Sequence, residues 1–473
     1  MGDWHTGRAD WLSIPEALER ILASVRPTEA EPVPLVDAFG RVLAEPAVSP
    51  IDHPPWDNSG MDGFAVRAED IAGATREAPA RLTVVDDIPA GGFPSRPIGP
   101  GEAAKIMTGA PVPEGADSVV RVEHTNAWAP AEAPGDDASR AAGAAHATVA
   151  PEARNADSIA GAPGPATGAV GTTILVFSDS DARRNVRRRG EDVRAGAVVV
   201  DAGRVLGPAE IGVLAATGHA TVMVHRRPRI AILANGDELV DLDRFEEVVA
   251  GRKIVNSNTY ALAAAVAAAG GEPIPLGIAP DDLEEIRARL VLGRDADAIL
   301  TTAGASVGQH DLVKDALLEL GFELDFWRVR MRPGSPFSFG RLGGVPVFGI
   351  AGNPVSVLVT FEVLVRPAIR RMLGRRDVHA CTIRVRAAER IPGAGRLTHF
   401  PRVRLESDGD GGYTARLTGS QGSAILSSVA AADALLVVPS GVEAIEPGQE
   451  ADAIPLFRND PAAQDFGFVA DAS

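Results

Sequence analysis

Three turns, each between a strand-like run and a helix-like run, hold small and polar residues that could bind a phosphate. NGDE at 235–238 follows RIAILA, GASVG at 304–308 follows AILTTA, and GNP at 352–354 follows VPVFGIA. Glycine lets a backbone approach a ligand, and a helix N-terminus favours a phosphate. A structural bend explains any single turn equally well, but all of them end predicted parallel strands, where open α/β sheets bind ligands. We therefore expect substrate contacts from Asn235, Gly236, Asp237, Gly304, Ser306, Gly308, Gly352, Asn353 and Pro354.

Acidic side chains beside two of these turns suggest a divalent metal ion. Glu238 closes the first turn, and Asp311 follows the second, with Lys314 one helical turn further on. Mg²⁺ is typically held by one or two carboxylates together with substrate oxygens. We therefore expect Glu238 and Asp311 to bind Mg²⁺ and Lys314 to contact the substrate. The alternatives are a helix cap for Asp311 and an ordinary surface acid for Glu238.

Three other loops carry an acid or a hydroxyl in an unusual setting. Asp62 lies between two glycines in WDNSGMDG, Thr108 opens TGAP with a hydroxyl that could bind an oxyanion, and Asp192 ends NVRRRGED. An Asx turn is the structural alternative for Asp62. The run of arginines before Asp192 would usually form a solvated surface.

A fourth loop, RPGSP, follows the strand-like run FWRVRM. Arg332 supplies a cation and Ser335 a hydroxyl on a segment stiffened by Pro333 and Pro336. Such a loop could hold a tetrahedral oxyanion, although a plain turn with proline is equally common.

Composition and missing motifs exclude several classes of function. The formal net charge is −17, which argues against a nucleic-acid binder, so an anionic substrate must be held by local groups. A single cysteine, Cys381, rules out an intrachain disulfide and a cysteine-based zinc cluster. No Walker A or H-E-x-x-H sequence occurs, and no G-x-G-x-x-G opens the first strand–helix unit. Without an apolar leader or a run of ~20 apolar residues, we expect a cytoplasmic protein with neither membrane nor nucleic acid as partner.

The periodicity of apolar residues divides the chain into segments with different predicted secondary structure. Ser13, Pro15 and Glu16 predict a capped helix that runs to Val25. Short Val/Ile runs between Gly/Pro turns predict a β-rich domain, interrupted at 128–171 by a stretch of Ala, Gly, Pro, Ser and Asp that we expect to be a flexible insertion. Strands and helices then alternate over 229–370, which predicts a parallel α/β sheet, and short strands over 382–457 predict a small β domain.

Taken together, the loops resemble the MoeA/gephyrin E-domain family. The matching strings are PPWDNSGMDGFAVR, IMTGAPVPEGADSVVRVE, NVRRRGED, NGDEL, AGASVGQHD, MRPGSPFSFG, FGIAGNPVSVLVTFEVLVRP and GSQGS. They occur in the family's order and cover nearly the whole chain outside the insertion. The resemblance implies an enzyme of molybdenum cofactor biosynthesis that inserts molybdate into adenylyl-molybdopterin, releases AMP and uses Mg²⁺ or a similar ion.

The resemblance also implies a fold of four domains and an elongated homodimer with its active site between subunits. These are an elongated helical and linker dimerisation domain (10–50 and 186–226), an inserted β-rich domain (51–185), a pterin-binding α/β domain (227–375) like that of the cofactor adenylyltransferases, and a C-terminal β-barrel-like domain (379–458). Molybdopterin adenylyltransferase and molybdoenzyme maturation factors are the partners that it suggests.

Residue by residue, the resemblance assigns functional acids and one hydroxyl to Asp62, Thr108, Asp192, Glu238 and Asp311. It assigns molybdate binding to Arg332, Ser335, Pro336 and Ser423. Two positions depart from the family: the usual Lys-Pro-Gly-Lys-Pro is Arg-Pro-Gly-Ser-Pro here, with one cation fewer, and Ala303 replaces the first of two glycines. These departures leave the preference between molybdate and tungstate open.

Two other functions remain as alternatives. A molybdopterin adenylyltransferase would act one step earlier on the same pterin and would need only the α/β domain. A non-enzymatic scaffold, a role that gephyrin also has, would require an extra domain and a long linker, which are missing from this sequence.

Overall fold

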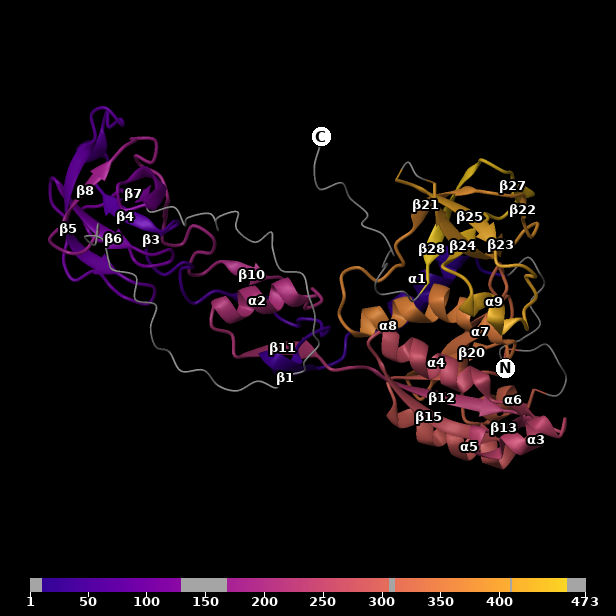
Figure 1. Ribbon diagram of the computed structural model, residues 1–473. Coiled ribbons are helices and arrows are strands. Elements are labelled where there is room, and N and C mark those ends of the chain that lie inside the picture. The colour runs from indigo at the N-terminus through magenta and orange to yellow at the C-terminus, as the bar shows by residue number, and fades with distance from the viewer. Residues whose placement is uncertain (1–10, 129–167, 306–310, 409–410, 457–473) are drawn as a thin grey trace, which may run out of the picture. The chain divides into compact units, whose positions relative to one another are not determined.

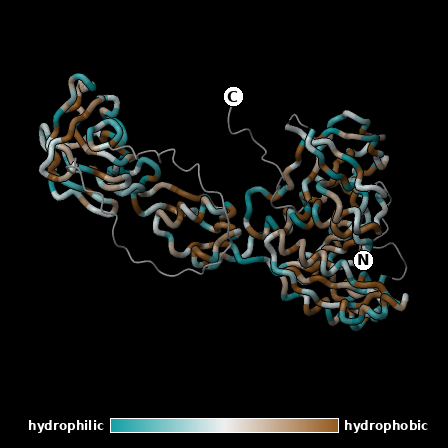
Figure 2. The backbone as a smooth tube through the Cα atoms, in the orientation of Figure 1, coloured by the Kyte–Doolittle hydropathy of each residue, from teal (hydrophilic) through white to brown (hydrophobic). Residues whose placement is uncertain are grey.

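The computed structural model describes residues 11–128, 168–305, 311–408 and 411–456. Ser306 and Gly308 lie outside the described residues, as do residues 129–167 of the predicted insertion. The chain forms two compact units: the larger comprises Met1–Ala47, Val200–Gly212 and His219–Ser473, and the smaller comprises Val48–Val199 and Val213–Gly218. Brown apolar stretches alternate with teal polar ones in both (Figure 2). Within the described ranges, no helix has the length and apolar character to cross a membrane.

The smaller unit is built on a five-stranded sheet with the order β7-β4-β6-β5-β8 (Figure 1). Its strands are β4 (Gly63–Val66), β5 (Ala80–Ile88), β6 (Glu102–Ile106), β7 (Ser118–Arg121) and β8 (Thr173–Val176). Strands β5 and β6 run parallel and the other neighbours antiparallel. A short pair, β3 (Asn58–Ser59) with β9 (Val186–Arg187), joins the loop before Asp62 to the NVRRRGED segment.

The larger unit begins with α1 (Ile14–Ser24), whose start is the predicted capping box: Ser13 accepts from the Glu16 backbone and the Glu16 side chain accepts from that of Ser13. Strand β1 (Ala30–Pro34) pairs antiparallel with β11 (Thr221–His225). Three short elements contain residues of both units: β2 (Ala47–Val48), β10 (Val198–Val200) and α2 (Pro208–Ala216).

The centre of the larger unit is a six-stranded sheet with the order β15-β12-β16-β20-β19-β17. Its bounds are β12 (Arg229–Asn235), β15 (Glu272–Ala279), β16 (Ala298–Thr301), β17 (Glu323–Trp327), β19 (Phe337–Leu342) and β20 (Val345–Ile350). Strands β15, β12, β16 and β20 are parallel, as predicted for this domain.

The sheet is mixed rather than wholly parallel, which corrects the prediction. Strand β19 is antiparallel to both β20 and β17. Gly343 and Gly344 join β19 to β20 with φ of 59° and 91°, and two such residues form the hairpin turn that matches strand twist. The predicted strand FWRVRM is also broken, because Arg328 has a φ of 72° and only Met331–Arg332 resumes as β18.

Helices cover both faces of this sheet, and the period-2 alternation along each strand separates the two cores. Ile230 and Ile232 face α4 (Ser257–Ala268) and the long helix made of α7 (Pro354–Thr360), a π-helical turn (Phe361–Val365) and α8 (Arg366–Met372). Ala231 and Leu233 face α5 (Leu283–Leu292) and α6 (Leu312–Glu319). In Figure 1 α4 and α8 lie on one side of the sheet and α5 on the other.

The C-terminal part forms a closed barrel with the order β21-β25-β24-β26-β28 around its own apolar core, which confirms the predicted barrel-like domain. Its elements are β21 (Ile383–Ala387), β24 (Arg402–Ser407), β25 (Tyr413–Leu417), α9 (Leu426–Ala430), β26 (Ala434–Val437) and β28 (Glu450–Pro455). Beside it, β22 (Ile391–Pro392) pairs with β27 (Ala444–Ile445). Strand β23 (Thr398–His399) pairs parallel with β18, which joins the RPGSP loop to the barrel.

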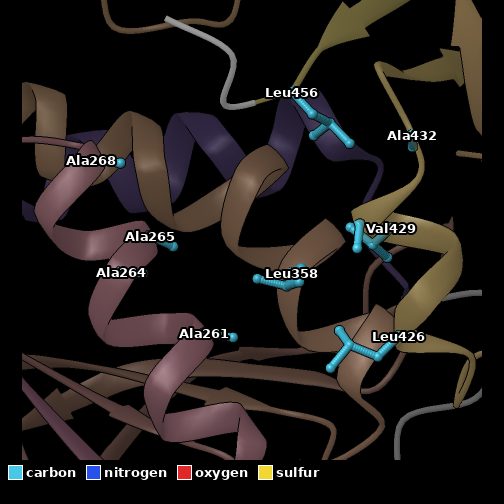
Figure 3. A pocket seen from close by; sticks show the side chains of 10 residues that line it. Ala261, Ala264, Ala265, Ala268, Leu358, Leu426, Val429, Ala432 and Leu456 are labelled. Carbon is cyan, nitrogen blue, oxygen red and sulfur yellow. The ribbon is translucent and has the colours of Figure 1, made fainter.

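An apolar groove of 420 Å³ lies where α4, α7 and α9 meet (Figure 3). Alanines of α4 form one wall, and Leu358, Leu426, Val429 and Leu456 form the other. Helix α4 contains no charged residue, so its alanines contribute a smooth apolar surface.

Candidate active site

The three predicted turns meet at one edge of the six-stranded sheet. Strands β12, β16 and β20 are neighbours and parallel, so their carboxyl ends share an edge. The backbone N–H of Thr302 donates to Leu233 at 3.1 Å, and the Ser338 hydroxyl donates to the Gly304 carbonyl at 3.0 Å. A Cβ on Gly352 would lie 3.1 Å from the Thr302 carbonyl oxygen. The turns after β16 and β20 are therefore in close backbone contact.

In the first turn, Asn235 and Asp237 serve mainly to hold the backbone. The Asn235 amide donates to the carbonyls of Ala279 and Pro280 at 3.3 and 3.1 Å, and the Asp237 carboxylate accepts from the Asp281 N–H at 3.1 Å. These bonds fasten the turn after β12 to the end of β15.

Gly236 is required where it stands. Its φ is +146°, a region that side chains avoid, and a Cβ there would lie 2.4 Å from an oxygen of Glu238. The Glu238 carboxylate thus occupies the space where a side chain at position 236 would lie, and it remains exposed at the sheet edge. In the ranges described, no cation forms an ion pair with it.

Asp311 has a structural role in the second turn. One oxygen of its carboxylate accepts from the Lys314 N–H at 3.3 Å, as the N-cap of α6, and from the Gly304 N–H at 3.1 Å. The cap alternative is therefore what is observed, and the same oxygen also orders the glycine turn. Within the described part of the chain, no cluster of three His, Cys, Asp or Glu side chains has the arrangement of a metal site.

A cleft of 480 Å³ adjoins this edge and gathers the residues expected to bind the oxyanion. Four segments line it: the loop after β18, the start of α7, β23 and the loop before α9. Its polar or charged lining residues are Arg332, Ser335, Asn353, Ser356, His399, Gln421 and Ser423, and Pro336 lines it as well. All four predicted oxyanion residues therefore share one cleft, and Asn353 belongs both to it and to the third turn.

Two hydrogen bonds determine how Ser335 and the loop that contains Ser423 can contact a ligand. The single O–H of Ser335 donates to the Val329 carbonyl at 3.0 Å, so this hydroxyl faces a ligand as an acceptor only. The backbone N–H of Val355 donates to the Ser423 carbonyl at 3.1 Å, which fixes the loop before α9 against the start of α7. Arg332 is exposed and carries the positive charge of the cleft wall.

Arg402, which the sequence analysis missed, lies behind the Gln421–Ser423 loop. Its side chain is 0% exposed. Nε donates to the Ser428 hydroxyl at 3.1 Å and one terminal nitrogen to the Gly422 carbonyl at 3.0 Å. Its other terminal nitrogen, Nη1, is buried without a hydrogen-bond partner among the described residues.

The charge of Arg402 also has no counter-ion in the part of the chain that is described. Burial lowers its pKa, yet a guanidinium stays protonated in proteins. A buried cation without a carboxylate is costly, and its charge makes the electrostatic potential behind the Gln421–Ser423 loop more positive. Alternation along RVRL places Arg402 on the face opposite the barrel-core residue Val403, and this face is buried because the segment from Ser420 to Ser428 covers it.

In the smaller unit, Asp62 and Thr108 are hydrogen-bonded to each other. Thr108 donates its N–H and its hydroxyl to the same Asp62 oxygen, each at 2.7 Å. These bonds, the backbone one most, lower the pKa of Asp62. The Asp62 side chain thus joins two loops, where the structural alternative was an Asx turn, and a pocket of 140 Å³ lies beside Asp62 and Lys105.

Asp192 is exposed on a separate turn of the same unit. Its backbone N–H donates to the His53 carbonyl at 3.2 Å. Two arginines of the neighbouring basic run form ion pairs, Arg188 with Asp57 and Arg189 with Asp52, each at 2.6 Å.

The family comparisons agree with this arrangement along the whole chain. The MoeA N-terminal region, domains I and II of that family, matches residues 12–218. A probable molybdopterin binding domain matches residues 231–371, and the MoeA C-terminal region, domain IV, matches residues 384–456.

Individual relatives match over nearly their full length. A molybdopterin molybdenumtransferase of Bacillus subtilis (strain 168) is 31% identical over 454 residues, 96% of each chain. One from Nostoc sp. is 35% identical over 430 residues, 89% of this chain and 88% of that protein. The crystal structure of the molybdopterin biosynthesis MoeA protein from Pyrococcus horikoshii OT3 has a TM-score of 0.74 at 29% identity and covers 94% of this chain and 100% of its own. The resemblance seen in the motifs is thus confirmed, and the chain belongs to the MoeA family.

Proposed function

We propose that this chain is a molybdopterin molybdenumtransferase, which inserts molybdate into adenylyl-molybdopterin and releases AMP in the last stage of molybdenum cofactor synthesis. The observation that carries the proposal is that Asn353 lies both in the third glycine-bearing turn and in the wall of the cationic cleft. A phosphorylated pterin at the turns would thus be adjacent to an oxyanion in the cleft.

In this proposal the turns bind the substrate's phosphates and pterin. Backbone groups of Gly304 and Gly352 approach the ligand, and Asn235 and Asp237 keep the first turn in position through their bonds to the end of β15. Lys314, Ser306, Gly308 and Pro354 would complete the substrate contacts.

The cleft residues would bind molybdate by preorganised electrostatics. Arg332 provides a charged donor, and Ser423 and Asn353 provide polar contacts from the loop before α9 and the start of α7. The buried charge of Arg402 raises the positive potential behind the Gln421–Ser423 loop without touching solvent.

Mg²⁺ fits the first turn only with help from the substrate. Glu238 is an exposed carboxylate at the sheet edge, whereas Asp311 already uses one oxygen for the Gly304 and Lys314 N–H groups. One or two carboxylates together with phosphate oxygens are enough for this ion. Bound between Glu238, Asp311 and the phosphates, it would offset the negative charge of the phosphoanhydride.

We further propose a cytoplasmic homodimer in which the partner subunit's smaller unit completes each site. The Asp62 carboxylate stays ionised at neutral pH because Thr108 stabilises its charged form. An ionised, oriented carboxylate can position water or a metal-bound group at the reacting phosphate. Asp192 would lie on the same surface as a further acid.

The adenylyltransferase and scaffold alternatives are less well supported. Two of the four segments that line the cleft are β23 and the loop before α9, which an enzyme restricted to the α/β domain would not need. A scaffold would have no use for a buried, unpaired cation beside a polar cleft.

The decisive experiment supplies the purified chain with adenylyl-molybdopterin, Mg²⁺ and molybdate and measures AMP. Release of AMP that depends on molybdate supports the proposal. A second reaction supplies molybdopterin and ATP without molybdate. Formation of adenylylated pterin there, with no molybdate-dependent AMP release in the first, would instead identify an adenylyltransferase.

A further inference from the structure

His399 and Arg332 are neighbours in the cleft. They are register partners in the parallel pair β18–β23, so their side chains leave the same face of that pair. Both line the cleft, and the His399 residue is 5% exposed. The imidazole is therefore a nearly dry titratable group that touches the space proposed for the oxyanion.

The hydrogen bond of one ring nitrogen defines the tautomer of His399. Nδ1 lies 2.9 Å from the Pro392 carbonyl oxygen, which can only accept, so Nδ1 carries a proton. In the neutral ring Nε2 then bears the lone pair. No described residue hydrogen-bonds Nε2, and this nitrogen gains a proton only when the ring becomes a cation.

Among the described residues, the two charged groups that act on His399 are both positive. Arg332 approaches from β18 and Arg402 from β24, while the β26 side contributes only the backbone bonds of Val438. Burial, assisted by the two guanidinium groups, lowers the pKa of His399 below its ordinary value, against the opposing effect of the Pro392 carbonyl. Without an anion beside it, the imidazole is therefore neutral at neutral pH.

A tetrahedral dianion in the cleft would reverse this balance. Its negative charge would offset the two guanidinium groups and favour a proton on Nε2, which could then donate to an anion oxygen. We propose that His399 is a specificity-determining residue that takes up one proton from solvent when a tetrahedral dianion such as molybdate binds, and returns it when the anion leaves. This inference rests on the proposed function, because it presumes that the cleft binds an oxyanion.

Proton uptake gives the cleft a way to distinguish ligands by charge as well as by shape. A dianion gains an additional charged donor at His399, whereas a monoanion of the same tetrahedral shape stabilises the imidazolium less. Linkage also fixes the sign of the pH dependence: dianion affinity rises as the pH falls through the raised pKa of the complex. Between this pKa and that of the free protein, the affinity changes by at most about tenfold per pH unit. Below the pKa of the free protein the affinity is constant.

The test is calorimetric titration of the full chain with molybdate, at micromolar concentration and pH 6 to 8, in two buffers of different ionisation enthalpy. The difference between the two heats gives the number of protons taken up. The wild-type chain is expected to take up a substantial fraction of one proton per molybdate and His399→Gln none, with a nearly flat pH profile. His379→Gln, an exposed histidine outside the cleft, is the matched control and should behave as wild type. Sulfate should resemble molybdate in proton uptake, and perchlorate should show little.

The outcomes separate this inference from the proposed function. Absence of saturable molybdate binding by the wild-type chain would overturn the function itself. Binding without proton uptake, or uptake that persists in His399→Gln, would overturn the role of His399 alone. Should His399→Gln not fold, an NMR titration of the wild-type histidines still decides the matter, with Arg332→Gln identifying the His399 resonance by raising its pKa. The inference fails if molybdate raises the pKa of no histidine.

Discussion

Thr108 donates both its backbone N–H and its hydroxyl to a single carboxylate oxygen of Asp62, each at 2.7 Å. The contact exists because Gly63 and Ile106 are register partners in β4 and β6, which brings the loops beside them together. Asp62 itself is exposed, so the two bonds orient the carboxylate more than they stabilise the fold.

Replacing Thr108 with valine tests this orientation. Thr108→Val keeps the N–H and removes the hydroxyl, so the pKa of Asp62 should rise toward that of an ordinary aspartate. We expect AMP release to fall about tenfold or more, because one lost orienting bond misaligns the carboxylate. The free energy of unfolding should change by less than about 1 kcal/mol.

An NMR titration of Asp62, the AMP assay and denaturant unfolding measure these effects. Because its folded pKa is depressed, Asp62 contributes its small stabilisation above the unfolded value and loses it as the pH falls through the folded one. The matched control is Thr75→Val, which removes another exposed hydroxyl of the same unit, bonded to the Ala78 N–H. Equal activity of the two variants would contradict an orienting role for Thr108.

Gly236→Ala should disrupt the first turn. The new Cβ would meet the Glu238 carboxylate at 2.4 Å, and the φ of +146° is strained for alanine. We expect a loss of about 1–3 kcal/mol in stability and a large loss of molybdate-dependent AMP release. Gly251→Ala is the control, since Gly251 also has a positive φ but nothing lies within 4 Å of a Cβ there. The double variant Gly236→Ala/Glu238→Ala should recover part of the stability but not the activity, and no recovery would show that the clash is unimportant.

The buried guanidinium of Arg402 can be removed without emptying its space. Arg402→Met should change the free energy of unfolding by no more than about 2 kcal/mol, because apolar replacement of a buried charge is often tolerated. Molybdate at 100 times its dissociation constant should stabilise the wild-type chain by about 2.7 kcal/mol, and the same concentration should stabilise the variant far less. Thermal unfolding with and without molybdate measures both effects. Arg404→Met, at an exposed arginine of the same strand, should respond to molybdate like wild type, and an equal response from Arg402→Met would remove Arg402 from the site.

Asp297 links the segment before β12 to the start of β16. Arg226 binds its two oxygens at 2.8 Å each, and the Arg229 N–H donates to it at 2.6 Å. Burial would raise its pKa, but the hydrogen bonds and charges of Arg226 and Arg229 outweigh burial and lower it. Its stabilisation is therefore full above the ordinary aspartate pKa and is lost as the pH falls through the folded value.

We accordingly expect Asp297→Asn to cost about 2 kcal/mol at pH 7 and progressively less as the pH falls toward 3. Urea unfolding at several pH values measures the difference. A cost that does not vary with pH would show that the carboxylate charge is unimportant. Asp295→Asn, two residues earlier, is a suitable control, since no ion pair of that side chain occurs in the described part of the chain.

Sequence alone could locate the turn-bearing edge because it depends on local patterns. Alternating strands and helices require parallel neighbours, so turns after successive strands must share an edge. The antiparallel strand β19 was missed although its signal is also local. Gly343-Gly344 between two β-like runs predicts a hairpin, but the runs were interpreted as part of a parallel sheet.

The long-range contacts of the site could not be predicted in this way. The Asp62–Thr108 bond joins residues 46 positions apart and depends on the register of β4 with β6. The burial of Arg402 depends on its cover by the 420–422 loop and α9, and the proximity of Arg332 to His399 depends on a two-residue parallel pair. Such short pairings have no periodicity from which to infer them.

Ser335 is the remaining departure from the family that can be tested by gain of function. Its hydroxyl proton is committed to the Val329 carbonyl, so it contributes no donor to an anion, and Ser335→Ala should weaken molybdate binding by less than about twofold. Ser335→Lys instead adds an ammonium group to a cleft in which Arg332 is the exposed cation. We expect it to bind molybdate several-fold more tightly, with the gain shrinking as salt concentration rises. The added charge should also lower the pKa of His399 and move the pH dependence of binding to lower pH. Calorimetric titration at two salt concentrations measures both shifts, and unchanged or weaker binding by Ser335→Lys would mean that the anion does not approach this side of the cleft.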